Sequence, residues 1–151
     1  MGPRNLAEKV IHLSSRFWLS LPAFYFVGLI LLNIISIPFA TNEMLDDCPE
    51  DSFNCDYRII ALDVSTDELH EAMESWADER SITTTFSEGH IVDRTFFMQF
   101  PDDVHYSNEC GTVEIFSKSR LGVGDLGVNA DRIDDIAVSY THLTLPTNGC
   151  V

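Results

Sequence analysis

The chain of 151 residues lacks the short motifs that mark the common catalytic and nucleotide-binding sites. It contains no Gly-x-Ser-x-Gly elbow, no His-Glu-x-x-His pair and no Walker loop. It also has no internal repeat and no low-complexity tract. These absences favour a binding or scaffolding protein over an enzyme, and we expect no catalytic residue, no bound metal and no cofactor.

Basic residues are scarce after residue 16. The stretch 41–137 holds 23 acidic residues against six lysines and arginines, which is a formal charge of −17. Binding to nucleic acid depends on lysines and arginines that neutralise phosphates, so we exclude nucleic acid as a partner. We interpret the charge as a solvated acidic surface, with the collection of divalent cations as the alternative.

Charge is absent altogether from residues 17–40. As a helix, this run exceeds the roughly 30 Å hydrocarbon core of a bilayer. Residues 1–16 carry Arg4, Lys9 and Arg16, which favour a cytoplasmic N-terminus. We therefore predict a single-pass transmembrane anchor with the remaining chain on the extracytoplasmic side. A cleaved signal peptide is the alternative, but the run is longer than usual and Pro38 stands where a small residue is expected.

The stretch 41–57 is rich in Asp, Glu, Asn and Pro and is predicted to be an acidic linker. It contains Cys48 and Cys55, for which the oxidising side of a membrane makes a disulfide plausible. Zinc binding is the alternative, although the chain has no Cys-x-x-Cys spacing. Cys110 could pair with either cysteine or remain a thiol.

Residues 58–137 show the pattern of an α+β domain, a small antiparallel sheet with helices on one face. Ser65 and Glu68 form a capping box, and an apolar stripe at helical spacing follows it: Leu69, Ala72, Met73, Trp76 and Ala77. The candidate strands are 58–64, 81–87, 91–100, 104–107 and 112–119. We expect the helix stripe to meet one face of the strand 91–100, formed by Val92, Phe96, Met98 and Phe100.

The paired carboxylates Asp102 and Asp103 follow Pro101, a composition typical of a turn. We predict that they form the turn between two strands. The alternative is chemical, because adjacent carboxylates can bind calcium or exchange protons. With Asp125 they would then serve a metal-dependent or acid/base enzyme.

The polar residues of the chain converge where the last strand, a glycine-rich loop and the final helix meet. The candidate site residues there are Ser117, Ser119, Arg120, Asp125, Asn129 and Arg132. The spacing of Gly122, Gly124 and Gly127 formally matches a dinucleotide fingerprint, which we reject because the preceding strands are joined by hairpin-length turns.

Two interpretations of this cluster remain. In the structural one, Asp125 or Asn129 caps the final helix while Arg120 pairs with Asp125. In the functional one, the two guanidinium groups, the serine hydroxyls and the helix N-terminus bind a carboxylate or phosphate.

The same stretch resembles domain-of-unknown-function family 1499. The family's pattern of Ser-x-Ser-Arg followed by Gly-x-x-Asp-Leu-Gly-x-Asn-x-x-Arg-Ile is present from Ser117 to Ile133. Its Cys-Pro and Asn-Cys segment is similar to that around Cys48 and Cys55, with a gap one residue longer here. The resemblance implies an exported or membrane-anchored domain, found in bacteria and in the thylakoid lumen of plants, with no established reaction.

Residues 138–147 resemble a translated reading frame of the adapter used in DNA library preparation, so residues 138–151 are interpreted as an adapter-derived tail. We therefore expect the natural sequence to end near Ala137 and the tail to have no stable place in the fold. The leading functional hypothesis is a membrane-anchored module that binds a protein or a small ligand. A carrier of a small apolar ligand, with its cavity beside Trp76, is a further alternative.

Overall fold

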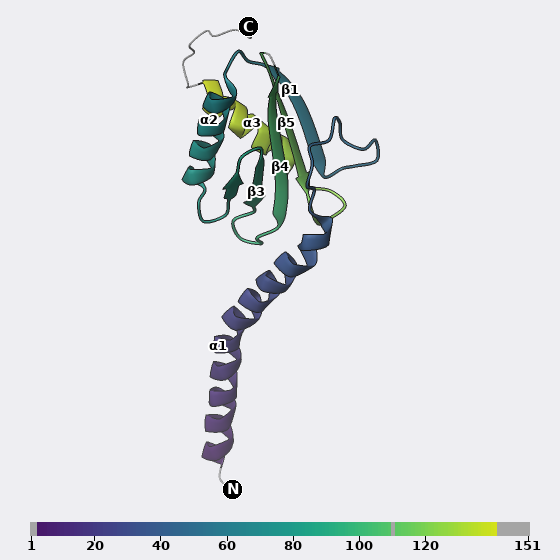
Figure 1. Ribbon diagram of the computed structural model, residues 1–151. Helices are drawn as coiled ribbons and strands as arrows, with labels where there is room; N and C mark the ends of the chain where they lie inside the picture. Colours follow the sequence, from purple (N-terminus) through teal and green to yellow (C-terminus); the bar gives the residue numbers. More distant parts are fainter. Residues whose placement is uncertain (1–2, 110, 142–151) are drawn as a thin grey trace. The chain divides into compact units, whose positions relative to one another are not determined.

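The computed structural model describes residues 3–109 and 111–141 and divides into two compact units, Met1–Ile35 and Ser36–Val151 (Figure 1). The first unit is formed by helix α1 (Pro3–Ser36), which a short 3-10 turn, η1 (Ile37–Phe39), continues. Within this helical stretch, Ser20–Phe39 is long and apolar enough to cross a membrane, with a mean hydropathy of 2.0. A signal sequence meets the same two criteria, so the helix alone does not choose between an anchor and a leader.

The second unit is an α+β domain, which confirms the predicted fold class. Its elements are β1 (Cys55–Ala61), α2 (Thr66–Glu79), β2 (Thr85–Ser87), β3 (His90–Arg94), β4 (Pro101–Glu109), β5 (Thr112–Ser119) and α3 (Val128–Thr141). The strands form one antiparallel sheet in the order β1-β5-β4-β3-β2. Helices α2 and α3 lie beside each other against this sheet (Figure 1).

Helix α2 forms where the sequence predicts it. The Ser65 hydroxyl accepts a hydrogen bond from the Glu68 amide, and the Glu68 carboxylate accepts one from the Ser65 amide, so both halves of the capping box are present. All five residues of the predicted stripe are buried. Trp76 is 4% exposed and its indole nitrogen donates to Asp135 of α3 at 3.1 Å. The helix therefore follows from local sequence and from the burial of one face.

The core lies between the helices and one face of the sheet. Side chains alternate between the two faces of a strand, so Val104 and Tyr106 of β4 point to the same face as Ile115 of β5. These residues belong to one buried apolar cluster with Met73 of α2 and Ile133 of α3. The opposite face of β4 and β5 also holds buried residues, as described below.

The strand predicted over 91–100 is interrupted. Strand β3 ends at Arg94, and residues 95–100 form a turn in which the Gln99 amide donates to the Thr95 carbonyl and the Phe100 amide donates to the Thr95 hydroxyl. Gln99 adopts a φ of 53° in this turn. Phe96 is 78% exposed, and Val92 points away from the core because its neighbour Ile91 pairs with Val104 on the core face. The expected contact between the helix stripe and the face of Val92, Phe96, Met98 and Phe100 is therefore wrong.

The prediction that Asp102 and Asp103 form a turn is also wrong. Both lie in β4, the central strand of the sheet, and both are buried. The turn signal misled because the chain reverses before Pro101, which takes the first position of the strand, where the missing N–H costs little.

The first residues of the predicted adapter-like tail belong to the end of α3. Residues 138–141 continue the helix, and residues 142–151 lie outside the described residues. Cys110, whose pairing the sequence left open, also lies outside them.

Candidate functional site

Arg132 of α3 is the centre of a buried polar network between this helix and the sheet. Its Nε donates to the Asp93 carboxylate at 2.8 Å, and its Nη2 donates to the Asp102 carboxylate. Its Nη1 donates to the Ser117 hydroxyl at 3.0 Å and to the Asn129 side-chain oxygen at 2.8 Å. All five residues are less than 5% exposed, so solvent competes little for these bonds.

Strand alternation explains how these residues meet. Asp93 pairs with Asp102 across β3 and β4, and Asp102 pairs with Ser119 across β4 and β5, so the three side chains share the face that α3 covers. On α3, Asn129 and Arg132 are three residues apart and therefore occupy one face of the helix. The network thus joins three strands to the last helix.

The side chain of Asn129 makes the remaining hydrogen bonds of the network. Its Nδ2 donates to the Asp125 carboxylate, to the Ser119 hydroxyl at 3.1 Å and to the Asn54 carbonyl at 2.8 Å. Its side-chain oxygen accepts from Ser117 at 2.6 Å. Asn129 is fully buried, and these contacts account for both its donor and its acceptor.

Asp125 caps the start of α3. Its carboxylate accepts the backbone amides of Gly127 at 3.0 Å and Asn129 at 2.9 Å. Partial burial disfavours the charged carboxylate, but these amide hydrogen bonds outweigh burial and lower the pKa of Asp125. Gly127 has a φ of 87°, a backbone conformation that glycine adopts without strain. The capping part of the structural interpretation therefore has a geometric basis.

The predicted pairing of Arg120 with Asp125 is not the one that the structure forms. Arg120 binds Asp103 with two hydrogen bonds, from Nε at 2.8 Å and from Nη2 at 2.6 Å. Asp103 follows Asp102 in β4 and points to the opposite face of the sheet. The two neighbouring carboxylates therefore bind different arginines on opposite sides of one strand.

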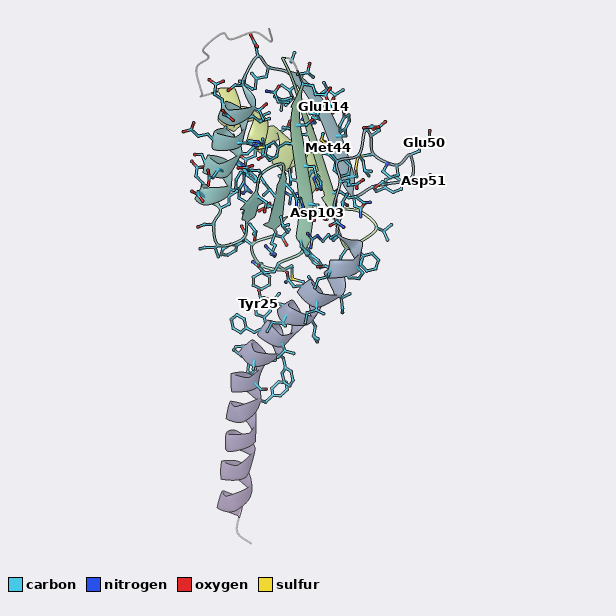
Figure 2. All side chains as sticks on the ribbon, viewed as in Figure 1. Tyr25, Met44, Glu50, Asp51, Asp103 and Glu114 are labelled. Atoms are coloured by element: carbon cyan, nitrogen blue, oxygen red, sulfur yellow. A yellow bond between two sulfur atoms is a disulfide. The ribbon has the colours of Figure 1, made fainter. Side chains whose placement is uncertain are left out.

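Asp103 also receives donors from two other parts of the chain. The His90 Nε2 lies 2.8 Å from its Oδ1, and the Thr41 amide donates to its Oδ2 at 2.8 Å. Burial disfavours the charged form of this carboxylate, but the hydrogen bonds from His90, Arg120 and Thr41 outweigh burial and lower the pKa of Asp103 to about 2. Figure 2 shows Asp103 toward one end of the sheet and Glu114 toward the other.

His105 completes this second cluster, which sequence reasoning missed. Its ring stacks on His90 with centroids 4.4 Å apart, and its Nε2 donates to the Thr41 carbonyl at 2.9 Å. Burial lowers the pKa of His105, which favours the neutral imidazole. The two histidines have no motif spacing; only their cross-strand pairing in β3 and β4 brings them together. Thr41 is therefore fixed to β4 through both its amide and its carbonyl.

The structure joins Cys48 and Cys55 in a disulfide, with a Cα–Cα distance of 5.9 Å. Cys55 is the first residue of β1, so the predicted strand begins earlier than the sequence suggested and takes in the end of the predicted linker. The disulfide closes the segment that follows Thr41 onto the edge of the sheet.

The three carboxylates of the enzyme hypothesis are not brought together. Asp102 pairs with Arg132 on the helix side of the sheet, Asp103 pairs with Arg120 on the other side, and Asp125 caps α3. Among residues 3–109 and 111–141, no group of three His, Cys, Asp or Glu side chains could hold a metal ion. The hydroxyls and guanidinium groups of the anion-binding hypothesis likewise bond to partners within the domain.

A cleft of about 750 Å³ opens beside the Arg132 network. The loop between α2 and β2, the end of β3 and the start of α3 line it, and Asp93 and Arg132 contribute from the network. Its polar lining includes Arg94, whose Nη1 donates to the Thr83 carbonyl at 3.3 Å. Its apolar lining includes Ile82 and Phe96, both well exposed. The cleft therefore offers both charged and apolar surface to a ligand.

The comparisons with known proteins give one match. A family model described as a protein of unknown function (DUF1499) matches residues 54–139, more than half of the chain and nearly all of the sheet and α3. No curated protein and no solved structure matches the chain.

Proposed function

Since the chain belongs to DUF1499, a family of proteins of unknown function, we propose a function from the geometry of its own domain. The protein is a single-pass membrane protein with a cytoplasmic N-terminus. Its α+β domain lies on the extracytoplasmic side and binds a small ligand or a protein there without catalysing a reaction.

The anchored topology is supported by three properties of the N-terminal part. The span Ser20–Phe39 matches the thickness of a bilayer, and Arg4, Lys9 and Arg16 precede it. The disulfide between Cys48 and Cys55 suits a compartment outside the reducing cytoplasm.

The cleft is the observation that carries the binding proposal. Its volume of about 750 Å³ falls within the range of small-molecule sites, roughly 300–1,000 Å³. The motif arginines Arg120 and Arg132 are engaged by buried carboxylates, so they hold the domain together instead of meeting a ligand. Arg94 and Ile82 at the cleft can contact the polar and the apolar part of one ligand.

Mass spectrometry of the full-length protein, extracted in detergent, tests the binding proposal. The substitution Ser81→Trp places a large side chain in the cleft, while Glu88→Trp places the same side chain at an exposed turn outside it. We expect a co-purifying small molecule or protein to be lost from Ser81→Trp and retained by Glu88→Trp. Equal retention by both variants would contradict the cleft as the binding site.

Alkaline extraction and protease protection test the topology. We expect the protein to remain in the membrane fraction and its domain to be digested only from the extracytoplasmic side. A mature protein whose N-terminus lies after Ala40 would instead identify residues 1–40 as a signal sequence.

A further inference from the structure

The end of the sheet where β4 begins carries exposed apolar side chains on three separate segments. We propose that this end, the apolar rim (Phe53, Phe96, Met98, Val123 and Leu126), inserts into the lipid surface beside the anchor. The rim is thus a second membrane contact in addition to the anchor. This proposal depends on the anchored topology proposed above.

The register of the sheet places these segments together. Arg94 pairs with Pro101, so the turn 95–100 lies at the start of β4. Asp102 pairs with Ser119, so the loop from β5 to α3 leaves at the same end (Figure 1). Phe53 joins them through a bridge to Gly124. The rim is therefore built from the turn before β4, the loop after β5 and the segment before β1.

The rim side chains are unusually exposed for their size. Phe53 is 75% exposed, Phe96 78%, Val123 87% and Leu126 fully exposed. Leu126 also has a φ of 56°, which is uncommon for a residue other than glycine, and in this loop it directs no part of the side chain into the core. Apolar groups clustered at one end of a domain mark a contact surface.

The short connection between the apolar span and the sheet indicates that the rim faces the membrane. The apolar span ends at Phe39, and Thr41, only two residues later, is bonded to Asp103 and His105 of β4. Two extended residues reach about 7 Å, which is close to the thickness of one headgroup layer. Phe39, Thr41 and the sheet belong to the same compact unit. An anchored chain therefore holds the start of β4 at the level of the headgroups.

The net charge of the domain decides whether the rim contacts lipid by inserting apolar side chains or by electrostatic attraction. The segment 41–137 has a formal charge of −17, so an anionic lipid surface repels the domain. The rim residues themselves are uncharged. The contact consequently depends on apolar side chains that enter the interface, as in interfacial segments rich in Phe and Leu.

Quenching of tryptophan fluorescence by brominated lipids tests the proposal with the full chain. The protein is reconstituted in phosphatidylcholine vesicles brominated near the headgroup, in a Trp18→Phe background that removes the tryptophan near the span. Trp76 is buried in the core and supplies a constant signal. The probes are Phe96→Trp and Val123→Trp on two rim segments. The matched control is Asp63→Trp, which follows the far end of β1, about 20 Å along the sheet at roughly 3.3 Å per residue.

We expect quenching at both rim positions to be at least twofold stronger than at Asp63→Trp. Adding 30% phosphatidylserine should leave this ratio unchanged or reduce it. Quenching at only one rim position, or at neither, overturns the rim. A blue-shifted rim tryptophan without bromine quenching also overturns the lipid assignment, because it indicates a protein partner.

Alkaline washing of the same vesicles tests the membrane anchor separately. A chain that is removed by alkaline washing contradicts the anchored topology itself. A chain that stays in the vesicles with unquenched rim probes contradicts only the rim.

Discussion

The two faces of β4 differ in what their buried carboxylates hold in place. On the helix side, Asp102 and its neighbour Asp93 share one arginine, Arg132, and tie α3 to the sheet. On the other side, Asp103 has Arg120 to itself and ties the segment at Thr41 to the same strand. One strand therefore fixes both the C-terminal helix and the point where the chain leaves the apolar span.

The comparison shows that equal residue types at adjacent positions can have opposite electrostatic environments. Burial raises the pKa of Asp102, because the loss of solvent outweighs the contacts with Arg132 and Ser119, and the nearby Asp93 carboxylate adds to the effect. The pKa of Asp103 is lowered to about 2, because donors from Arg120, His90 and Thr41 outweigh burial. Removing the cation on the helix side should cost more, because two carboxylates are buried against it. The stability that Asp103 contributes on the opposite side is the part that acid removes.

The largest effect should come from Arg132→Met. The substitution leaves the carboxylates of Asp93 and Asp102 buried without their cation, and breaking a buried pair costs about 3–5 kcal/mol. Thermal or denaturant unfolding of the detergent-solubilised protein measures the loss. The loss of stability in Arg132→Met should become smaller as the pH is lowered. A carboxyl that is buried without its cation has a raised pKa, so it takes up a proton and the folded state is stabilised.

The control for this prediction is Arg80→Met. Arg80 pairs with the exposed Asp135, and exposed ion pairs contribute about 0–1 kcal/mol. If Arg132→Met and Arg80→Met destabilise equally, the buried network is not what joins α3 to the sheet.

The next largest effect should come from the disulfide, which ties the segment after Thr41 to the start of β1. Replacing Cys48 and Cys55 by serine should lower the free energy of unfolding by about 2.5 kcal/mol in the chain-entropy estimate for so short a loop. Unfolding with and without reductant measures it, and the double variant should have lost its response to reductant. A wild-type protein equally stable under both conditions would contradict the assignment.

A somewhat smaller effect is expected from Asp103→Asn. A carboxyl whose pKa falls from 3.8 to about 2 on folding stabilises the folded state by about 2 kcal/mol above its unfolded pKa. This stability is lost as the pH falls from about 4 to about 2. Wild type and variant should therefore differ most above pH 4 and converge toward pH 2. A constant difference across that range would show that the charge of Asp103 is not responsible.

The smallest effect is expected from Asp125→Ala, which removes the cap of α3 and one of the hydrogen bonds of the Asn129 side chain. Loss of the hydrogen bonds to the amides of Gly127 and Asn129 should cost about 1 kcal/mol. Asp125→Asn should recover part of the loss, because an amide oxygen also caps a helix. A loss as large as that of Arg132→Met would mean that Asp125 carries the network and does not merely cap the helix.

Local patterns predicted α2 well and the connection after β3 poorly. The capping box and the stripe from Leu69 to Ala77 involve residues three and four positions apart, so the helix is decided within one stretch of sequence. Phe96 and Met98 instead alternate like a strand. The chain reverses there, because the Thr95 hydroxyl accepts a hydrogen bond from the Phe100 amide and Gln99 adopts a positive φ. Alternation alone does not distinguish an exposed turn from a buried strand.

Sequence reasoning named several residues of the candidate site, but it named neither Asp93 nor the pairs that the side chains form. Sequence reasoning selected Arg120, Asp125 and Arg132 from one motif and joined the first two because they are neighbours in the chain. The structure gives Arg120 a partner 17 positions away and Arg132 partners 30 and 39 positions away. His90 and His105 were passed over because only the register of β3 and β4 brings them together.

The sequence by itself determined the charge-free span, the acidic domain, the amphipathic helix α2 and the motif that the family shares. Each depends on composition or on spacing within a few residues. Only the tertiary structure decided which arginine binds which carboxylate and which loops share one end of the sheet. The reason is the pleat of β4, in which consecutive side chains point to opposite faces of the sheet. The partners of Asp102 and Asp103 are therefore set by the elements that the fold packs on each face.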